Sequence, residues 1–265
     1  MACVSQTADP IAAGAVAVLV PVSDIAAAAG LYDLILGPRA DADTPIWPVA
    51  GGALVLGPPG ESASAAFRVA QPEQAGRLLA RRGVAVSPQT GPGGTRRLLG
   101  APALGVTDEI PGGPPGAGAV APAVDHLVFT AAQADEAIAL LAGRLGLDLR
   151  LVQSFEGLQQ LFFRSHEVVV EVIVGDPGDG AQPVAGVSLW GVAWRTGDLA
   201  QAHRRLTEAG VALSPIRDGR KNGTRVVTVR EPALGIATLL IEHLDRRTGD
   251  GRGPVRTVPD PPRTR

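Results

Sequence analysis

Along most of the chain, groups of short apolar runs are separated by one longer stretch in which apolar and polar residues alternate at helical spacing. The pattern is most regular between residues 124 and 243. Runs rich in Val, Leu, Phe and Ile with period-two alternation predict strands, and apolar residues at a 3.6-residue spacing predict helices. Residues 134–147 and 199–210 show the helical spacing. The predicted strands are 124–131, 149–155, 158–165, 168–174, 188–196, 211–216, 224–230 and 236–243. The order is therefore strand, helix and three strands, and it occurs twice.

The connections within each unit are short. Short strand–turn–strand spacing favours antiparallel hairpins. Gly146 and Gly210 follow the two helical patterns, as helix C-terminal caps commonly do. The pattern predicts an α+β protein built from βαβββ modules.

The N-terminal half repeats this plan in reduced form. Residues 65–88 resemble residues 192–215 at a constant offset in the numbering, so that Arg68 aligns with Arg195. Residues 14–22 form a further predicted strand and residues 24–37 a helix, whose Gly37 aligns with Gly146 at a smaller offset. The first module is thus shorter than the second by about the length of one β-hairpin. Residues present in only one copy are the first candidates for chemistry.

Composition divides the chain further. Residues 110–123 are Pro, Gly and Ala almost throughout, which is typical of a linker. The last twenty residues have few apolar side chains, so we expect disorder there. We therefore predict a degenerate domain over 1–110, a linker over 111–122, a second domain over 123–245 and a tail over 246–265.

The overall charge argues against several partners. Of 265 residues, 45% are hydrophobic and 19% charged, with a net charge of −2, which favours neither nucleic-acid nor membrane-surface binding. Cys3, as a single cysteine, excludes an internal disulfide framework and a cysteine zinc cluster. The apolar stretch 11–22 is short and lacks preceding Lys or Arg, so we expect a buried strand and a cytoplasmic protein, monomeric or homodimeric.

Three strand residues stand out in the second domain. His126, Glu171 and Glu242 each interrupt an apolar run. A carboxylate there is costly to bury unless it is paired or coordinates a metal. One imidazole and two carboxylates facing one cavity would suit a divalent cation.

These runs, VDHLVF, VVVEVI, GVAWRTGDL and ATLLIEH, resemble the vicinal oxygen chelate superfamily, which contains the glyoxalases, bleomycin-resistance proteins and extradiol dioxygenases. The resemblance implies tandem cupped mixed sheets. It places metal ligands on the first, fourth, fifth and eighth strands, so that His126, Glu171 and Glu242 occupy three positions and Gly191 the fourth. It further implies Zn, Ni, Mn, Co or Fe as Lewis acid, with Glu171 or Glu242 as catalytic base.

Aromatic and basic residues complete the predicted site. Phe155, Phe163, Trp190 and Trp194 gather in the second domain and are candidates to line an apolar substrate pocket. Arg217 and Arg220, in a Gly-punctuated loop, are either ordinary surface charges or a clamp for an anionic substrate.

Three functional hypotheses remain open on the sequence. The leading one is a metal-dependent enzyme, with lyase or isomerase chemistry on a small oxygenated metabolite rather than oxygen activation. The alternative is a metal-free protein that binds or sequesters a small ligand. The third is a scaffold or interaction module.

Overall fold

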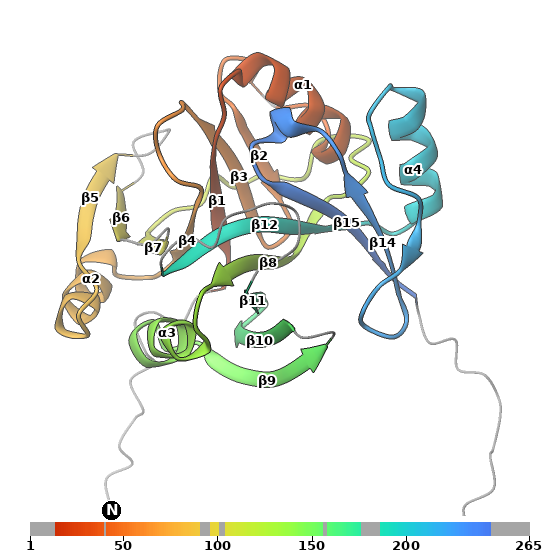
Figure 1. The fold of residues 1–265 in the computed structure, drawn as a ribbon. Coiled ribbons are helices and arrows are strands. Elements are labelled where there is room, and N and C mark those ends of the chain that lie inside the picture. The colour runs from red at the N-terminus through yellow and green to blue at the C-terminus, as the bar shows by residue number, and fades with distance from the viewer. Residues whose placement is uncertain are drawn as a thin grey trace, which may run out of the picture.

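A computed structural model of the chain describes residues 14–39, 41–90, 96–100, 104–155, 158–175 and 186–244. They form two mixed β-sheets, of seven and eight strands, with helices packed against them (Figure 1). The predicted α+β class and its tandem modules are confirmed. The predicted tail, residues 246–265, lies outside the described residues.

The eight-stranded sheet is built from two matching halves, in the order β13-β14-β15-β12-β8-β11-β10-β9. The central strands β8 and β12 pair antiparallel, and each has a parallel partner on its outer side, β11 and β15 respectively. The strands are β8 (Ala123–Ala131), β9 (Asp148–Phe155), β10 (Leu158–Ser165), β11 (Val168–Val174), β12 (Val187–Arg195), β13 (Arg217–Asp218), β14 (Thr224–Val229) and β15 (Ala237–His243).

The seven-stranded sheet has the same plan with one strand fewer, in the order β2-β3-β1-β4-β7-β6-β5. Its central pair β1 and β4 is antiparallel, with parallel partners β3 and β7. The predicted shortening of the first module therefore removes the strand that would lie beyond β2. The strands are β1 (Val16–Pro21), β2 (Ile46–Val49), β3 (Gly52–Gly57), β4 (Ser64–Arg68), β5 (Val86–Thr90), β6 (Arg96–Gly100) and β7 (Leu104–Thr107).

Each module contributes one helix against its sheet. The side chains of Asp24 and Asp198 cap two of the helices by accepting from the third main-chain N–H that follows. Gly146 and Gly210 end helical segments with φ of 77° and 82°, as the sequence predicted. The helices are α1 (Ile25–Leu36), α2 (Pro72–Arg81), α3 (Ala134–Ile138) with a π-helical continuation η2 (Ala139–Arg144), α4 (Leu199–Glu208) and the short η3 (Pro232–Leu234).

One predicted strand does not form. Residues 211–216 hold only an isolated bridge between Leu213 and Val229, and the edge strand starts at Arg217. Pro215 explains the difference, because it has no N–H to donate to a sheet.

The two sheets share one hydrophobic core, which contains buried residues of both domains. The buried hydroxyl of Tyr32 on α1 donates to the carbonyl of Leu234 in the second domain, at 3.0 Å. The connecting segment is tied to the same helix, since the main-chain N–H groups of Val120 and Ala121 both donate to the carbonyl of Ile35 at 3.0 Å. The domains are therefore packed against each other over a continuous apolar interior.

Candidate functional site

The candidate site lies on the sheet face opposite α3 and α4, which we call the cup face. On β8, Leu127 and Phe129 point into the shared core with the helices. His126 and Val128 therefore project to the cup face, because successive strand residues alternate. Glu171 on β11 is the register partner of Val128 and so lies on the same face. The structure brings His126 and Glu171 together, as the sequence predicted.

A chain of polar side chains crosses the cup face. The imidazole Nε2 of His126 lies 3.3 Å from Oε2 of Glu171, and its Nδ1 lies 2.8 Å from Oδ1 of Asp125. The other oxygen of Glu171 accepts from Nε2 of Gln160 at 2.6 Å, and Oε1 of Gln160 accepts from Gln153 at 2.9 Å. Gln160 is 1% exposed, so this amide is fixed inside the protein. We call Gln153, Gln160, Glu171, His126 and Asp125 the polar relay.

A β-bulge places Asp125 in the relay. His126 pairs with Ala193 and Val124 pairs with Trp194, which leaves Asp125 as an extra residue in β8. Bulges redirect side chains that regular alternation would send to the other face. The Oδ2 of Asp125 accepts from Nε of Arg195 at 3.0 Å and from Nε2 of His243 at 2.6 Å.

The relay is strongly polarised. Burial alone would lower the pKa of His126, but the hydrogen bonds and charges of Asp125 and Glu171 outweigh it and raise that pKa to about 9. Burial would likewise raise the pKa of Asp125, yet His126 and His243 hold it well below its usual range. At neutral pH, His126 is therefore an imidazolium between two carboxylates, and both of its nitrogens carry protons.

The structure separates Glu242 from this pair. On β15 the residues paired with the cup-face positions of β12 are Ala237, Leu239 and Ile241. Glu242 lies between them in alternation and points to the other face, where Nε and Nη2 of Arg225 donate to its Oε2 at 3.0 and 2.6 Å. The predicted three-residue cluster is thus not assembled.

Gly191 occupies the fifth-strand position for a steric reason. A Cβ at Gly191 would lie 2.7 Å from the carbonyl oxygen of Ala237 on β15 and 3.1 Å from its Cβ. Real Cβ atoms do not approach a backbone oxygen so closely, so no side chain fits without moving the strand. A bulge at Trp190 immediately precedes this close approach.

These residues do not fit a divalent metal. Gly191 and Leu239 offer no donor atom and Glu242 faces away, which leaves only His126 and Glu171 of the predicted ligand positions. Among the described residues no group of three or more His, Cys, Asp or Glu side chains is arranged to hold a metal ion. The hydrogen-bonded imidazolium instead supplies the positive charge at the floor of the cup.

The predicted aromatic residues divide between the two faces. Trp194 and Phe163 are fully buried in the shared core, so they pack the fold rather than line the cup. Trp190, at the bulge, is partly exposed, and the side chain of Phe155 lies outside the described residues. Phe162, a neighbour of Phe163 in the same run, pairs with Glu171 across the cup face and is partly exposed.

The two predicted arginines lie at the opposite edge of the sheet. Arg217 is exposed on β13 and pairs in register with Val226. Arg220 is exposed in the turn that follows. The contacts of the described residues bring neither of them to the polar relay.

Sequence reasoning missed Asp125, Gln160, Arg195 and His243. A glutamine pair inside the apolar run of β10 was a usable signal, because a buried amide needs partners. No sequence signal marked Arg195 and His243, because they contact the relay through Asp125, which a bulge places there.

Comparisons with known proteins agree with this fold. The sequence profile described as "Glyoxalase/Bleomycin resistance protein/Dioxygenase superfamily" matches residues 125–228. No curated protein sequence matches the chain. No helix among the described residues is long and apolar enough to cross a membrane.

Two solved structures share the architecture of both domains. A variant of 4-hydroxymandelate synthase from Streptomyces coelicolor has 13% identity and a TM-score of 0.58, covering 88% of this chain and 92% of its own. BphC, a halotolerant catechol dioxygenase, has 12% identity and a TM-score of 0.59, covering 87% and 86% respectively. At such identities the likeness concerns the fold.

The fold is thus that of a tandem protein of the vicinal oxygen chelate type. Residues 125–228, within the second domain, carry the sequence signature of the glyoxalase/bleomycin resistance/dioxygenase superfamily.

Proposed function

We propose that this protein is a metal-free member of its superfamily that binds a small organic ligand in the cup of the second domain. The observation that carries the proposal is the loss of two of the four ligand positions: Gly191 has no side chain, and Glu242 faces away and pairs with Arg225. His126 and Glu171, 3.3 Å apart, are joined to each other and to Asp125 and Gln160 by hydrogen bonds.

The surroundings of the relay support ligand binding. Val128 and Ile173, on the cup face, form an apolar floor beside Glu171, and Phe162 and Trp190 are partly exposed around it. An apolar surface with a few fixed polar groups is typical of small-molecule sites. Each oxygen of Glu171 accepts one bond and retains acceptor capacity, so a ligand that donates an O–H or N–H matches the site.

A second candidate is an enzyme that transfers protons without a metal. It is favoured by the carboxylate of Glu171, whose side chain is 13% exposed on the cup face. However, each of its oxygens already accepts one hydrogen bond, from Gln160 at 2.6 Å and from His126 at 3.3 Å, which a substrate proton would have to displace. Binding is therefore the better-supported function.

The decisive experiment combines metal analysis with ligand screening. Protein purified without chelators should contain no stoichiometric divalent metal, and EDTA should leave its Tm unchanged. Matched aromatic compounds with and without hydroxyl or amino groups are then compared by thermal shift and calorimetry. We expect donor-bearing members to bind at least tenfold more tightly, with the preference lost in Glu171→Gln. A bound metal that disappears in His126→Ala would contradict the proposal, and no binding by any compound would favour a scaffold.

A further inference from the structure

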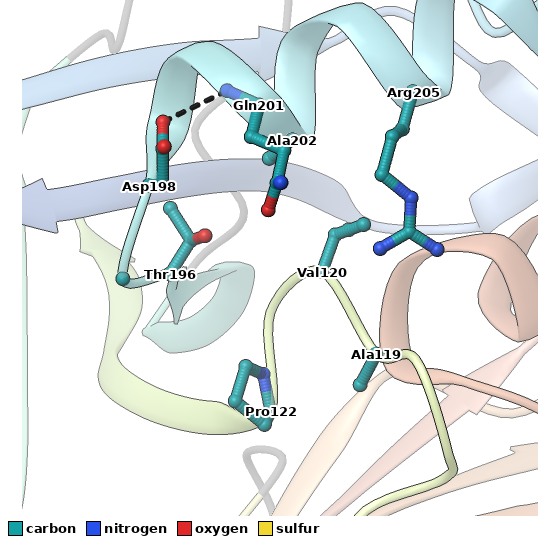
Figure 2. Close-up of a pocket in the computed structure, with 9 residues that line it drawn as sticks. Ala119, Val120, Pro122, Thr196, Asp198, Gln201, Ala202 and Arg205 are labelled. Atoms are coloured by element: carbon teal, nitrogen blue, oxygen red, sulfur yellow. Dashed lines mark hydrogen bonds between the residues drawn. The ribbon is translucent and has the colours of Figure 1, made fainter.

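A pocket of about 270 Å³ lies outside the cup, where the connecting segment meets the N-terminal half of α4. Ala119, Val120 and Pro122 form its floor, and the turn after β12 and the first two turns of α4 form the rest (Figure 2). At about 30 Å³ per water, its volume corresponds to roughly nine waters, which suits a small metabolite.

The pocket is lined by a hydroxyl that has no partner among the described residues. Thr196 is 4% exposed, and its hydroxyl makes no hydrogen bond with any described residue. Figure 2 shows this oxygen directed into the pocket, towards the side-chain amide of Gln201. The residue is buried, but its oxygen opens onto the pocket, where a water or a ligand can supply the hydrogen-bond partner that the protein does not.

A cation completes the polar lining. Nη2 of Arg205 donates to the carbonyl of Gly118 at 3.0 Å, which orients the guanidinium over the pocket. No contact among the described residues uses its Nη1. On the other side, Asp198 caps α4 by accepting from the main-chain N–H of Gln201 at 2.8 Å, through one of its two oxygens. The pocket therefore offers a guanidinium, a hydroxyl and an amide, with one carboxylate oxygen at its edge.

The internal repeat provides a control for these residues. Val69 is the equivalent of Thr196 in the first domain, because both main-chain N–H groups make the same inter-strand bond. That of Val69 donates to the carbonyl of Thr107 at 2.8 Å, and that of Thr196 donates to the carbonyl of Ile241 at 2.9 Å. At the same offset in the numbering, Leu78 corresponds to Arg205. The scaffold thus accepts apolar residues at both positions, and fold alone does not explain the polar pair in the second domain.

We propose that this pocket is a second ligand site, which takes a small hydroxylated carboxylate. The guanidinium of Arg205 matches a carboxylate. The hydroxyl of Thr196 and the amide of Gln201 match the ligand's own hydroxyl, and the free oxygen of Asp198 can accept from it. The site is independent of the cup, because its residues lie on the connecting segment, the end of β12 and α4.

Calorimetry with malate and succinate tests the proposal, since these acids differ by one hydroxyl. We expect malate to bind the wild-type protein at least tenfold more tightly than succinate or inorganic phosphate. Thr196→Val, the isosteric residue found in the first copy, should weaken malate binding about tenfold, because a hydrogen bond is lost. Arg205→Leu should abolish it. Val69→Thr, the matched control in the first domain, should leave malate binding unchanged.

Each other result overturns the proposal. No malate binding by the wild-type protein removes the site, and phosphate binding at or above the malate affinity refutes the carboxylate class. Unchanged affinity in Thr196→Val or Arg205→Leu places the bound malate elsewhere. If Arg205→Leu does not fold, Gln201→Ala, on the exposed side of α4, serves in its place, and full retention of affinity in that variant also counts against the site.

Discussion

At equivalent strand positions, the second domain has charged residues and the first domain has apolar ones. By register, His126 corresponds to Ala17, since each pairs with the equivalent alanine of the next central strand, Ala193 and Ala66. Glu171 likewise corresponds to Val55. The first domain therefore carries buried alanine and valine where the second carries an imidazolium and a carboxylate.

The backbone differs at the same places. The register between β1 and β4 is unbroken, whereas β8 and β12 pair through bulges at Asp125 and Trp190. A mixed sheet of this kind thus folds with small apolar residues in a regular register. The irregularities belong to the domain with the polar relay, in line with the association of bulges with functional sites.

Moving the relay into the first domain should have the largest effect. Ala17→His with Val55→Glu places two charges at sites that are 1% and 2% exposed, without the partners Asp125 and Gln160. Burying such charges is costly, and we expect a loss of about 4 kcal/mol in the free energy of unfolding, measured by urea denaturation. The reverse exchange, His126→Ala with Glu171→Val, should cost less, about 2 kcal/mol, because apolar residues replace both members of the pair and only the amide N–H of Gln160 loses its acceptor. Equal costs would mean that the two domains tolerate charge alike.

A methyl group at Gly191 should be the next most damaging change. Gly191→Ala forces β12 away from the carbonyl of Ala237, with an expected cost of about 3 kcal/mol by thermal denaturation. Gly57→Ala in the first domain is the control, because a Cβ there meets nothing within 4 Å. Gly191→His should gain no metal affinity. A stable Gly191→His variant that binds zinc would refute the steric argument.

Raising the pH should weaken the second domain through His126. Its pKa is raised from an ordinary 6.5 to about 9, so its contribution to stability is complete below about pH 6.5 and is lost as the pH rises through 9. We expect the free energy of unfolding to fall by about 2 kcal/mol between about pH 6.5 and pH 9.5. Chemical denaturation across this range measures the slope, and His126→Asn should flatten it. An identical slope in that variant would assign the effect to other groups.

Removing the ion pair on the opposite face should matter least. Arg225 and Glu242 have side chains 34% and 12% exposed, so Glu242→Gln should cost less than about 1 kcal/mol. Cup-ligand affinity should be unchanged in the same variant, which calorimetry can test. A tenfold loss of affinity would return Glu242 to the binding site.

The sequence predicted the features that depend on the spacing of apolar residues. It did not predict which face of the sheet a side chain lies on where a single extra residue changes that face. The repeat, the module order and the match of His126 to Ala17 all follow from spacing. The orientation of Glu242 does not, because alternation fixes which residues share a face but not which face is the cup. The bulge at Asp125 inserts one residue that no composition signal marks, and it alone brings Arg195 and His243 to the relay.

The strand missing beside β2 also affects how the protein behaves among its own copies. Its loss leaves β2 as an outer strand, and open strand edges invite pairing with neighbouring chains. Pro48 lies within β2. Gly113 of the connecting segment lies close to the ring of Pro48, since a Cβ at this glycine would be 3.3 Å from the ring. The opposite edge strand, β5, carries Pro88. Each proline removes an N–H from an exposed edge, so both margins of the shortened sheet are guarded against aggregation.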